Sequence, residues 1–222
     1  MKLTFNFHQT LNFLDELSRN NSRDWFDLNR PAFETARSSF EGFIDSLIDE
    51  LRTSDNLQGL SANECIFRIY RDLRFSKDKT PYNTNFSAVI APGGKKSPLQ
   101  GYYVSIEPQG RSMIAGGLHM PTSDQISRFR QAIDRDAAAY KAVTGVNVFV
   151  KQFGKIEGER LKTAPKGYDR DHPEIELLQL KEVVAIHNFP DQDLLAGDFL
   201  DKAVTVCRAM KPFLVYLDEI LQ

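Results

Sequence analysis

The chain has 222 residues, of which 41% are hydrophobic, so it can bury a substantial core without a disulfide or a metal ion. Its 28 basic and 30 acidic residues nearly cancel, which excludes the strong overall field of a nucleic-acid coat or a membrane-surface protein. A single domain spanning residues 1–222 is therefore expected, and any electrostatic attraction must be local.

The N-terminal residues 1–8 are too few and too polar for the apolar part of a signal peptide. No run of about 18 apolar residues predicts a transmembrane helix anywhere in the chain, so no membrane partner is expected. Cys65 and Cys207 lie far apart in apolar runs and lack a CxxC spacing. Together these features favour a cytoplasmic location.

Residues 10–53 have a helical pattern. Thr10 is placed to cap a first helix, and the polar residues 20–22 end it and start a short turn. Pro31 fits the first turn of a longer helix, in which residues 33–51 form one apolar stripe. This stripe predicts that the helix packs against a flat partner.

Residues 65–120 supply that partner, a β-sheet. Runs rich in β-branched and aromatic residues, separated by glycine and proline, predict strands over residues 66–75, 86–91, 101–107 and 112–119. The turns that join successive strands are too short for a parallel crossover, which needs about a dozen residues or more. An antiparallel meander is the result.

Residues 122–222 are helical and mixed. Thr122 or Ser123 is placed to cap a helix, and a second helix over 137–143 ends at Gly145. The remaining expected elements are a strand at 146–153, an irregular connection at 154–171, a short helix at 173–180, a strand at 181–189, and a helix at 191–222 that Pro212 kinks or breaks. These elements predict an α+β fold, an antiparallel meander with helices packed mainly on one face.

The strongest chemical signal is the basic segment, residues 68–82. Its cations are Arg68, Arg71, Arg74, Lys77 and Lys79, and its acids are Asp72 and Asp78. Guanidinium groups bind carboxylate or phosphate in a bidentate manner, and Tyr70 and Tyr82 offer rings for stacking or hydroxyls for hydrogen bonds.

In a strand over residues 66–75, alternation places Arg71 on the apolar face of Ile69 and Leu73. An unpaired guanidinium there would cost several kcal/mol, so an acidic partner or a bound anion is required. Two interpretations stay open: an anion pocket, or a structural network. In the network Arg68 pairs with Glu107, Arg71 pairs with Asp72 or Asp78, and Lys77 and Lys79 keep a turn soluble.

Several motifs carry a resemblance to a known family. They are Trp25 and Phe26, then residues 67–82, 101–103, 116–121 and 166–173, in that order. Over nearly its whole length the chain resembles the domain of unknown function 2461 family. The resemblance implies no particular activity, because the family has no established reaction. The chain has His119 where the family commonly has Trp, and Tyr168 where Phe is common, and the first departure counts against a family-wide catalytic histidine.

Two other groups are candidates for chemistry. His119 follows the pair Gly116 and Gly117 at a strand end, where it would act as an acid or base, but a glycine bulge is the simpler explanation. Asp169, Asp171 and His172 invite a metal site, yet their spacing matches no known metal motif, and Asp171 or His172 capping the helix that Pro173 begins is simpler. No metal site is predicted.

The sequence therefore predicts a basic pocket that binds a small ligand bearing phosphate or carboxylate. Its candidate ligand-binding residues are Arg68, Tyr70, Arg71, Arg74, Lys77, Lys79, Tyr82 and His119. If the chain is an enzyme, these cations would stabilise negative charge developing in a transferase or hydrolase reaction. A nucleic-acid module would instead extend the basic surface over Lys95, Lys96, Lys151, Lys155, Arg160, Lys162 and Lys166. A partner-binding protein without a ligand pocket is the third alternative.

Overall fold

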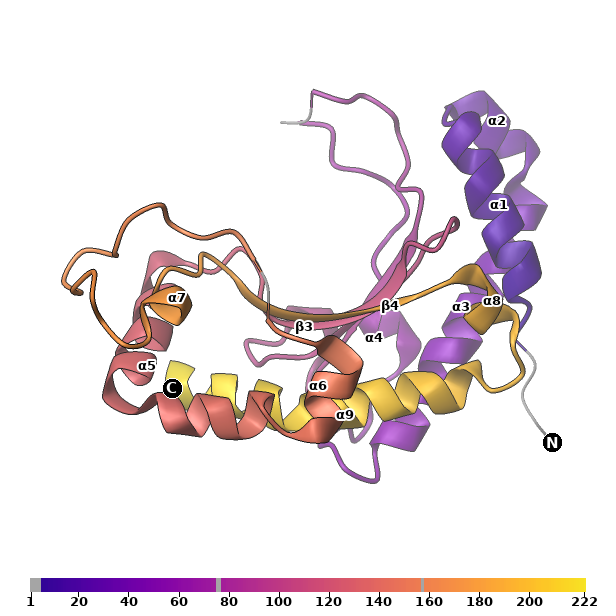
Figure 1. The fold of residues 1–222 in the computed structure, drawn as a ribbon. Coiled ribbons are helices and arrows are strands. Elements are labelled where there is room, and N and C mark those ends of the chain that lie inside the picture. Colours follow the sequence, from indigo (N-terminus) through magenta and orange to yellow (C-terminus); the bar gives the residue numbers. More distant parts are fainter. Residues whose placement is uncertain (1–4, 75–76, 157) are drawn as a thin grey trace. The chain divides into compact units, whose positions relative to one another are not determined.

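The structure is a computed structural model that describes residues 5–74, 77–156 and 158–222 (Figure 1). The chain forms two compact units. The first unit contains the described residues up to Ser97, together with Tyr102–Ile114 and Asn188–Thr205. The second unit contains Pro98–Gly101, Ala115–His187 and Val206–Gln222, with Glu157 outside the described residues.

Four strands form one open antiparallel sheet. They are β1 (Phe86–Ile90), β2 (Tyr102–Ile106), β3 (Ser112–Leu118) and β4 (Val183–Phe189), in the order β1-β2-β3-β4. In the pairing of β1 with β2, Ala88 lies opposite Val104 and Ser87 opposite Ser105. The predicted α+β class and the antiparallel meander are therefore confirmed.

The prediction of a strand over residues 66–75 is wrong, because the described residues of this stretch form only isolated β-bridges. Ile66 forms an isolated bridge with Ala88 at the outer edge of β1, and Tyr70 forms another with Tyr82. The chain turns back after Tyr70, so the backbone N–H of Arg71 donates to the carbonyl of Pro81. High β-propensity cannot by itself provide a partner strand. Phe75, the predicted end of this strand, lies outside the described residues.

Helices α1 (Phe7–Arg19), α2 (Arg23–Leu28), α3 (Arg30–Leu51) and α4 (Ala62–Cys65) belong to the first unit. Of the polar residues 20–22, which are predicted to start a short turn, Ser22 caps α2, and proline lies in the first turn of α3 as predicted. The cap of α1 is Asn6 rather than Thr10, because the helix begins earlier and Thr10 is buried within it. The buried Thr10 hydroxyl has a hydrogen-bond partner, because it donates to the Asn6 carbonyl.

The core of the first unit is built largely from aromatic rings. Phe40 on α3 stacks on Phe86 of β1, with ring centroids 5.6 Å apart. Phe43 stacks on Phe199, at the start of α9 (Phe199–Leu221), at 5.0 Å. Each fully buried phenylalanine stabilises the fold by about 2–3 kcal/mol, so the apolar stripe of α3 holds this helix against the sheet.

The second unit contains α5 (Ser123–Thr144), α6 (Asn147–Phe153), α7 (Ile175–Leu178) and most of α9. Thr122, not Ser123, caps α5, and Gln125 completes a capping box with it. Asp136 has non-helical backbone angles and interrupts α5, where the second predicted helix begins.

The first unit also holds the 3-10 turn η1 (Gly94–Lys96) and the short helix α8 (Asp191–Leu195).

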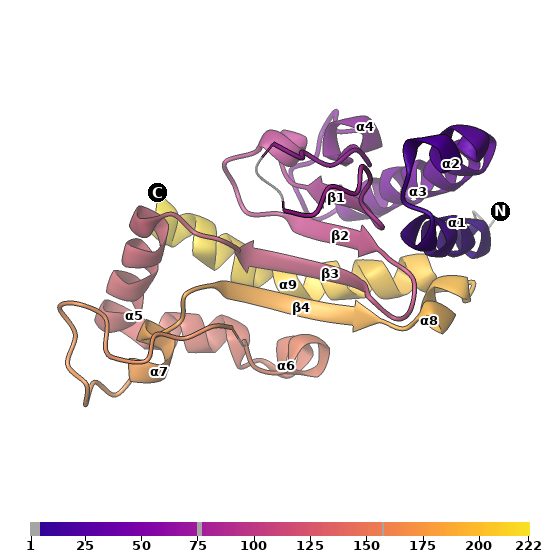
Figure 2. The same cartoon turned by 90° about the horizontal axis from the view of Figure 1, so that it is seen from above.

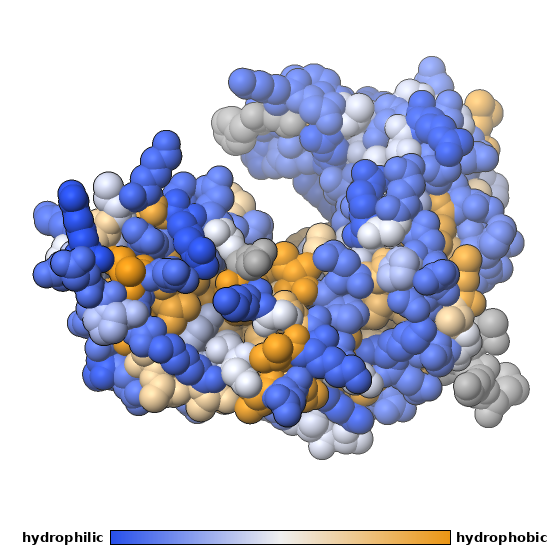
Figure 3. All heavy atoms as spheres, viewed as in Figure 1, coloured by the Kyte–Doolittle hydropathy of each residue, from blue (hydrophilic) through white to orange (hydrophobic). Residues whose placement is uncertain are grey.

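Two predictions for the C-terminal part are wrong. In the predicted strand at 146–153, residues 147–153 form helix α6 instead, because Phe149 is buried against Phe213 of α9 while Val148 and Val150 stay exposed. Hydrophobic atoms are visible in Figure 3 where α6 lies. The single helix predicted at 191–222 is two helices, α8 and α9, separated at residues 196–198.

Helix α9 runs through Pro212 to Leu221, so the proline does not end it. In Figure 2 the helix lies behind β3 and β4. Among the described residues, no helix has the length and apolar content that would let it span a membrane. A side chain at Gly116 would collide with Met210 of α9, and one at Gly117 would collide with the carbonyl of Val183. The glycine pair therefore serves close packing between neighbouring elements.

Candidate ligand-binding site

Arg71 is neutralised within the basic segment. Its guanidinium pairs with the carboxylate of Asp78 and donates to the hydroxyl of Thr80, and 24% of its side chain is exposed. The backbone N–H of Thr80 and then the Arg71 guanidinium hold the pKa of Asp78 at about 2. The predicted need for an acidic partner is thus met by Asp78.

Arg74 is also paired, with Asp72. Its Nε lies 3.0 Å from Asp72 Oδ1 and its Nη2 2.6 Å from Oδ2, a bidentate arrangement on the surface. Hydrogen bonds from the side chain and the backbone of Arg74 hold the pKa of Asp72 at about 2. Lys79 donates from Nζ to the carbonyl of Leu73 at 3.0 Å. These contacts join residues 71–74 of the segment to one another and to residues 78–79.

Arg68 differs from both. Within the described residues its guanidinium makes no ion pair and no hydrogen bond. The predicted pair with Glu107 does not form, because Glu107 pairs with Arg111 at 3.2 Å. The structural network therefore accounts for Arg71 and Arg74 but leaves Arg68 available to a ligand.

One cavity beside Arg68 is strongly basic. It has a volume of about 650 Å³ and is called the basic cavity here. Its cationic lining residues are Arg30, Arg37, Arg68, Lys95 and Lys96. The one acidic residue in the lining is Glu34. The apolar part of its wall is formed by Phe33, Ile66, Phe67, Ile69, Tyr70 and Phe86. A ligand in the basic cavity would meet cations and aromatic rings together.

Three of these cations already have partners. Arg37 pairs with Glu41 at 2.7 Å, and Arg30 lies 3.4 Å from Asp27. Lys95 donates to the carbonyls of Asn63 and Ile66 at 3.1 and 2.8 Å, which ties η1 to the end of α4. Lys96, by contrast, has no ion pair or hydrogen bond from its side chain within the described part of the chain.

A second cavity, of about 530 Å³, is lined mainly by uncharged polar residues and is called the polar cavity. Phe67, Arg68 and Tyr70 line both cavities. The polar cavity adds Arg71, Asp72, Asn83, Asn85, Ser87 and Tyr103. Ser87 and Tyr103 project from the face of the β1–β2 pair opposite to that of Phe86, because adjacent strand residues alternate.

Of the remaining predicted residues, Tyr70 lines both cavities, and the others lie elsewhere. Tyr82 is only 4% exposed and stacks on Phe26 at 4.1 Å, so it belongs to the core. Tyr70 is 47% exposed and packs at 5.3 Å from Tyr82. Lys77 is exposed and lines neither cavity. His119 lies in the second unit, where its Nδ1 is 3.1 Å from Glu182.

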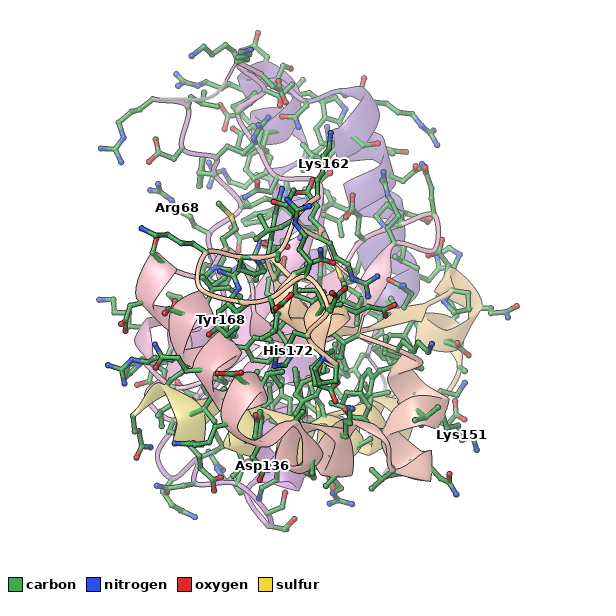
Figure 4. All side chains as sticks on the ribbon, turned by 60° about the vertical axis from the view of Figure 1, so that its left-hand side comes forward. Arg68, Asp136, Lys151, Lys162, Tyr168 and His172 are labelled. Carbon is green, nitrogen blue, oxygen red and sulfur yellow. The ribbon has the colours of Figure 1, made fainter. Side chains whose placement is uncertain are left out.

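The residues considered for a metal site have local roles. His172 Nδ1 accepts the backbone N–H of Glu174 at 3.0 Å, and Nε2 lies 3.1 Å from Asp134. Tyr168 and His172 are neighbours in Figure 4, with ring centroids 6.4 Å apart. No cluster of three or more His, Cys, Asp or Glu side chains that could hold a metal ion occurs among the described residues. The predicted cap by Asp171 or His172 does not form, because α7 begins at Ile175 and its N-cap Glu174 makes no side-chain capping bond; His172 accepts a hydrogen bond from the backbone before the helix.

Sequence reasoning missed Arg30, Arg37, Asn83 and Asn85 as cavity residues. A seven-residue spacing places Arg30 and Arg37 on one face of α3, next to Phe33, and this signal was present in the sequence. For Asn83 and Asn85 no sequence signal exists, since they reach the polar cavity only through the turn-back of the chain after Tyr70.

The fold and site define an α+β protein with an open antiparallel sheet and a basic, aromatic cavity at the sheet's edge. The chain belongs to the DUF2461 family, whose sequence model, described as a conserved hypothetical protein, matches residues 9–216. No curated protein and no solved structure matches the chain at a significant level.

Proposed function

We propose that the chain binds a small ligand bearing phosphate or carboxylate in the basic cavity. The observation that carries the proposal is Arg68, whose guanidinium makes no ion pair and no hydrogen bond with the described residues, has only the charge of Asp72 nearby, and lines a cavity with four further cations. A planar guanidinium binds either anion with two parallel hydrogen bonds. A free guanidinium beside a cavity supports anion binding more strongly than charge density alone.

In this proposal the side chains of Arg68 and Lys96 bind the anion. Arg71 and Arg74 act indirectly, because their pairs with Asp78 and Asp72 hold the loop that follows Tyr70. The cytoplasm is the proposed location, and the two buried cysteines, Cys65 and Cys207, fit a reducing compartment.

Thermal unfolding with added anions tests the proposal. Inorganic phosphate, pyrophosphate and citrate are the probes, each at constant ionic strength. A bound probe at about 100 times its Kd should raise Tm by about 5–10 °C, because it binds only the folded state. Arg68→Ala should abolish this shift and should leave Tm without the probe nearly unchanged.

Arg170→Ala is the matched control, since Arg170 is exposed, belongs to the second unit and lines neither cavity. It removes the same charge and should retain the full shift. Equal shifts for wild type and Arg68→Ala, or no shift with any of the three probes, would overturn the proposal.

A further inference from the structure

We propose that the ligand is a nucleotide, with its phosphate on Arg68 and its base stacked on Phe67. This inference rests on the proposed function and adds the chemical class of the ligand. It draws on a second set of observations, the surroundings of Phe67 and the lining of the polar cavity.

Phe67 is an exposed ring in a cavity whose other phenylalanines are buried. Its surface is 40% exposed, and its ring contacts no other aromatic ring of the described residues, whereas Phe33 and Phe86 in the same cavity are buried in ring clusters. The backbone is nevertheless fixed, because the N–H of Phe67 donates to the carbonyl of Ser87 at 2.9 Å. A solvent-facing ring on a fixed backbone is a stacking surface for a flat ligand.

The ring and the free cation are consecutive residues. Phe67 and Arg68 both line both cavities, so one ligand can reach the two side chains at once. A nucleotide has the matching composition: a flat aromatic base joined to a phosphate through one sugar. An inorganic anion or a simple carboxylate would leave the Phe67 ring unused.

The polar cavity supplies partners for the rest of a nucleotide. Asn85 donates from Nδ2 to the hydroxyls of Ser105 at 2.8 Å and Tyr103 at 3.5 Å, and its carboxamide oxygen accepts no hydrogen bond from the described residues. Ser87 and Tyr103 add hydroxyl groups to the same lining. Uncharged donors and acceptors suit sugar hydroxyls and base edges, whereas a second anion would require cations.

Calorimetry with matched ligands separates the base from the phosphate. The probes are AMP, ribose 5-phosphate and inorganic phosphate, titrated into the full chain at one ionic strength. Stacking on an aromatic side chain should make AMP bind about tenfold tighter than ribose 5-phosphate, or more. Phe67→Leu, which removes the ring but keeps apolar volume, should bring AMP to the affinity of ribose 5-phosphate and leave ribose 5-phosphate unchanged.

Phe67→Tyr keeps a ring and should restore the preference for AMP, which a purely structural role for Phe67 would not explain. A single-stranded RNA of eight nucleotides, titrated at two salt concentrations, identifies the source of the nucleotide. Tighter binding than AMP with a steep salt dependence indicates a nucleic-acid strand, and no gain over AMP indicates a free nucleotide. Both results support a nucleotide ligand.

Equal affinities for AMP and ribose 5-phosphate, or an unchanged preference in Phe67→Leu, would overturn the nucleotide class. In that case the loss of phosphate binding in Arg68→Ala would still support the proposed anion site. If no phosphate compound binds, both proposals fail together.

Discussion

At the scale of single residues, the three arginines of the basic segment show how neighbours decide the role of a side chain. Arg74 lies two residues from Asp72 and Arg71 seven residues from Asp78, and each pair closes within the same loop. Arg68 precedes the loop; its charge contributes to lowering the pKa of Asp72, but it forms no ion pair with the described acids there. Residues of one type, three positions apart, are therefore divided between loop stabilisation and the candidate site.

The hydrogen bonds that Asp78 accepts from the Thr80 backbone and from Arg71 predict a pH dependence of stability. The folded pKa of Asp78 is about 2, below its ordinary value of 3.8. The ionised carboxylate therefore stabilises the fold above about pH 4, and this contribution is lost as the pH falls toward about 2. Asp78→Asn should lower Tm at pH 6, and its difference from wild type should shrink steadily below about pH 4 in calorimetric scans.

Asp171→Asn is the control for this prediction, because Asp171 is exposed and its carboxylate has no partner within the described residues. Its Tm should follow that of wild type at every pH. A difference between Asp78→Asn and wild type that stays constant from pH 6 to about pH 3 would contradict the role given to Asp78.

At the scale of elements, β3 depends on two glycines. Gly117 has a φ of +125° and faces the Val183 carbonyl, so a side chain there would be both strained and obstructed. Gly117→Ala should lower the free energy of unfolding by about 3 kcal/mol or more, measured by urea denaturation.

Gly59→Ala is the matched comparison. Gly59 has a φ of +72° but nothing within 4 Å of an added Cβ, so its cost is that of the left-handed backbone alone, about 1 kcal/mol. Equal costs at the two positions would show that packing against Val183 is not what requires glycine in β3.

At the scale of the whole molecule, three elements contain residues of both compact units: β3, β4 and α9. Disrupting one unit would interrupt hydrogen-bonded elements of the other. We therefore expect both units to unfold in a single transition. A single unfolding transition would support the single domain that the sequence predicts.

Each unit contains one buried cysteine, Cys65 in the first and Cys207 in the second. Burial raises the pKa of the Cys65 thiol to about 11, so it should react slowly with thiol reagents while folded. In Cys207→Ser and Cys65→Ser variants, the remaining thiol should become reactive over the same urea range. Separate midpoints would show that the units unfold independently.

The sequence by itself determined the features that depend on local periodicity and on turn chemistry. These include the apolar stripe of α3, the Ser22 cap, the antiparallel meander, and the position of the basic segment. Each follows from residues close together in the chain, whose spacing and backbone preferences are visible without a fold.

Only the tertiary structure decided which of these residues meet. The path after Tyr70 leaves Arg68 unpaired between two cavities, and α3 adds Arg30 and Arg37 to one of them. The same packing draws Tyr82 into the core and makes residues 147–153 a helix through the contact of Phe149 with Phe213. These outcomes depend on contacts between residues distant in the chain, and local patterns carry no information about such partners.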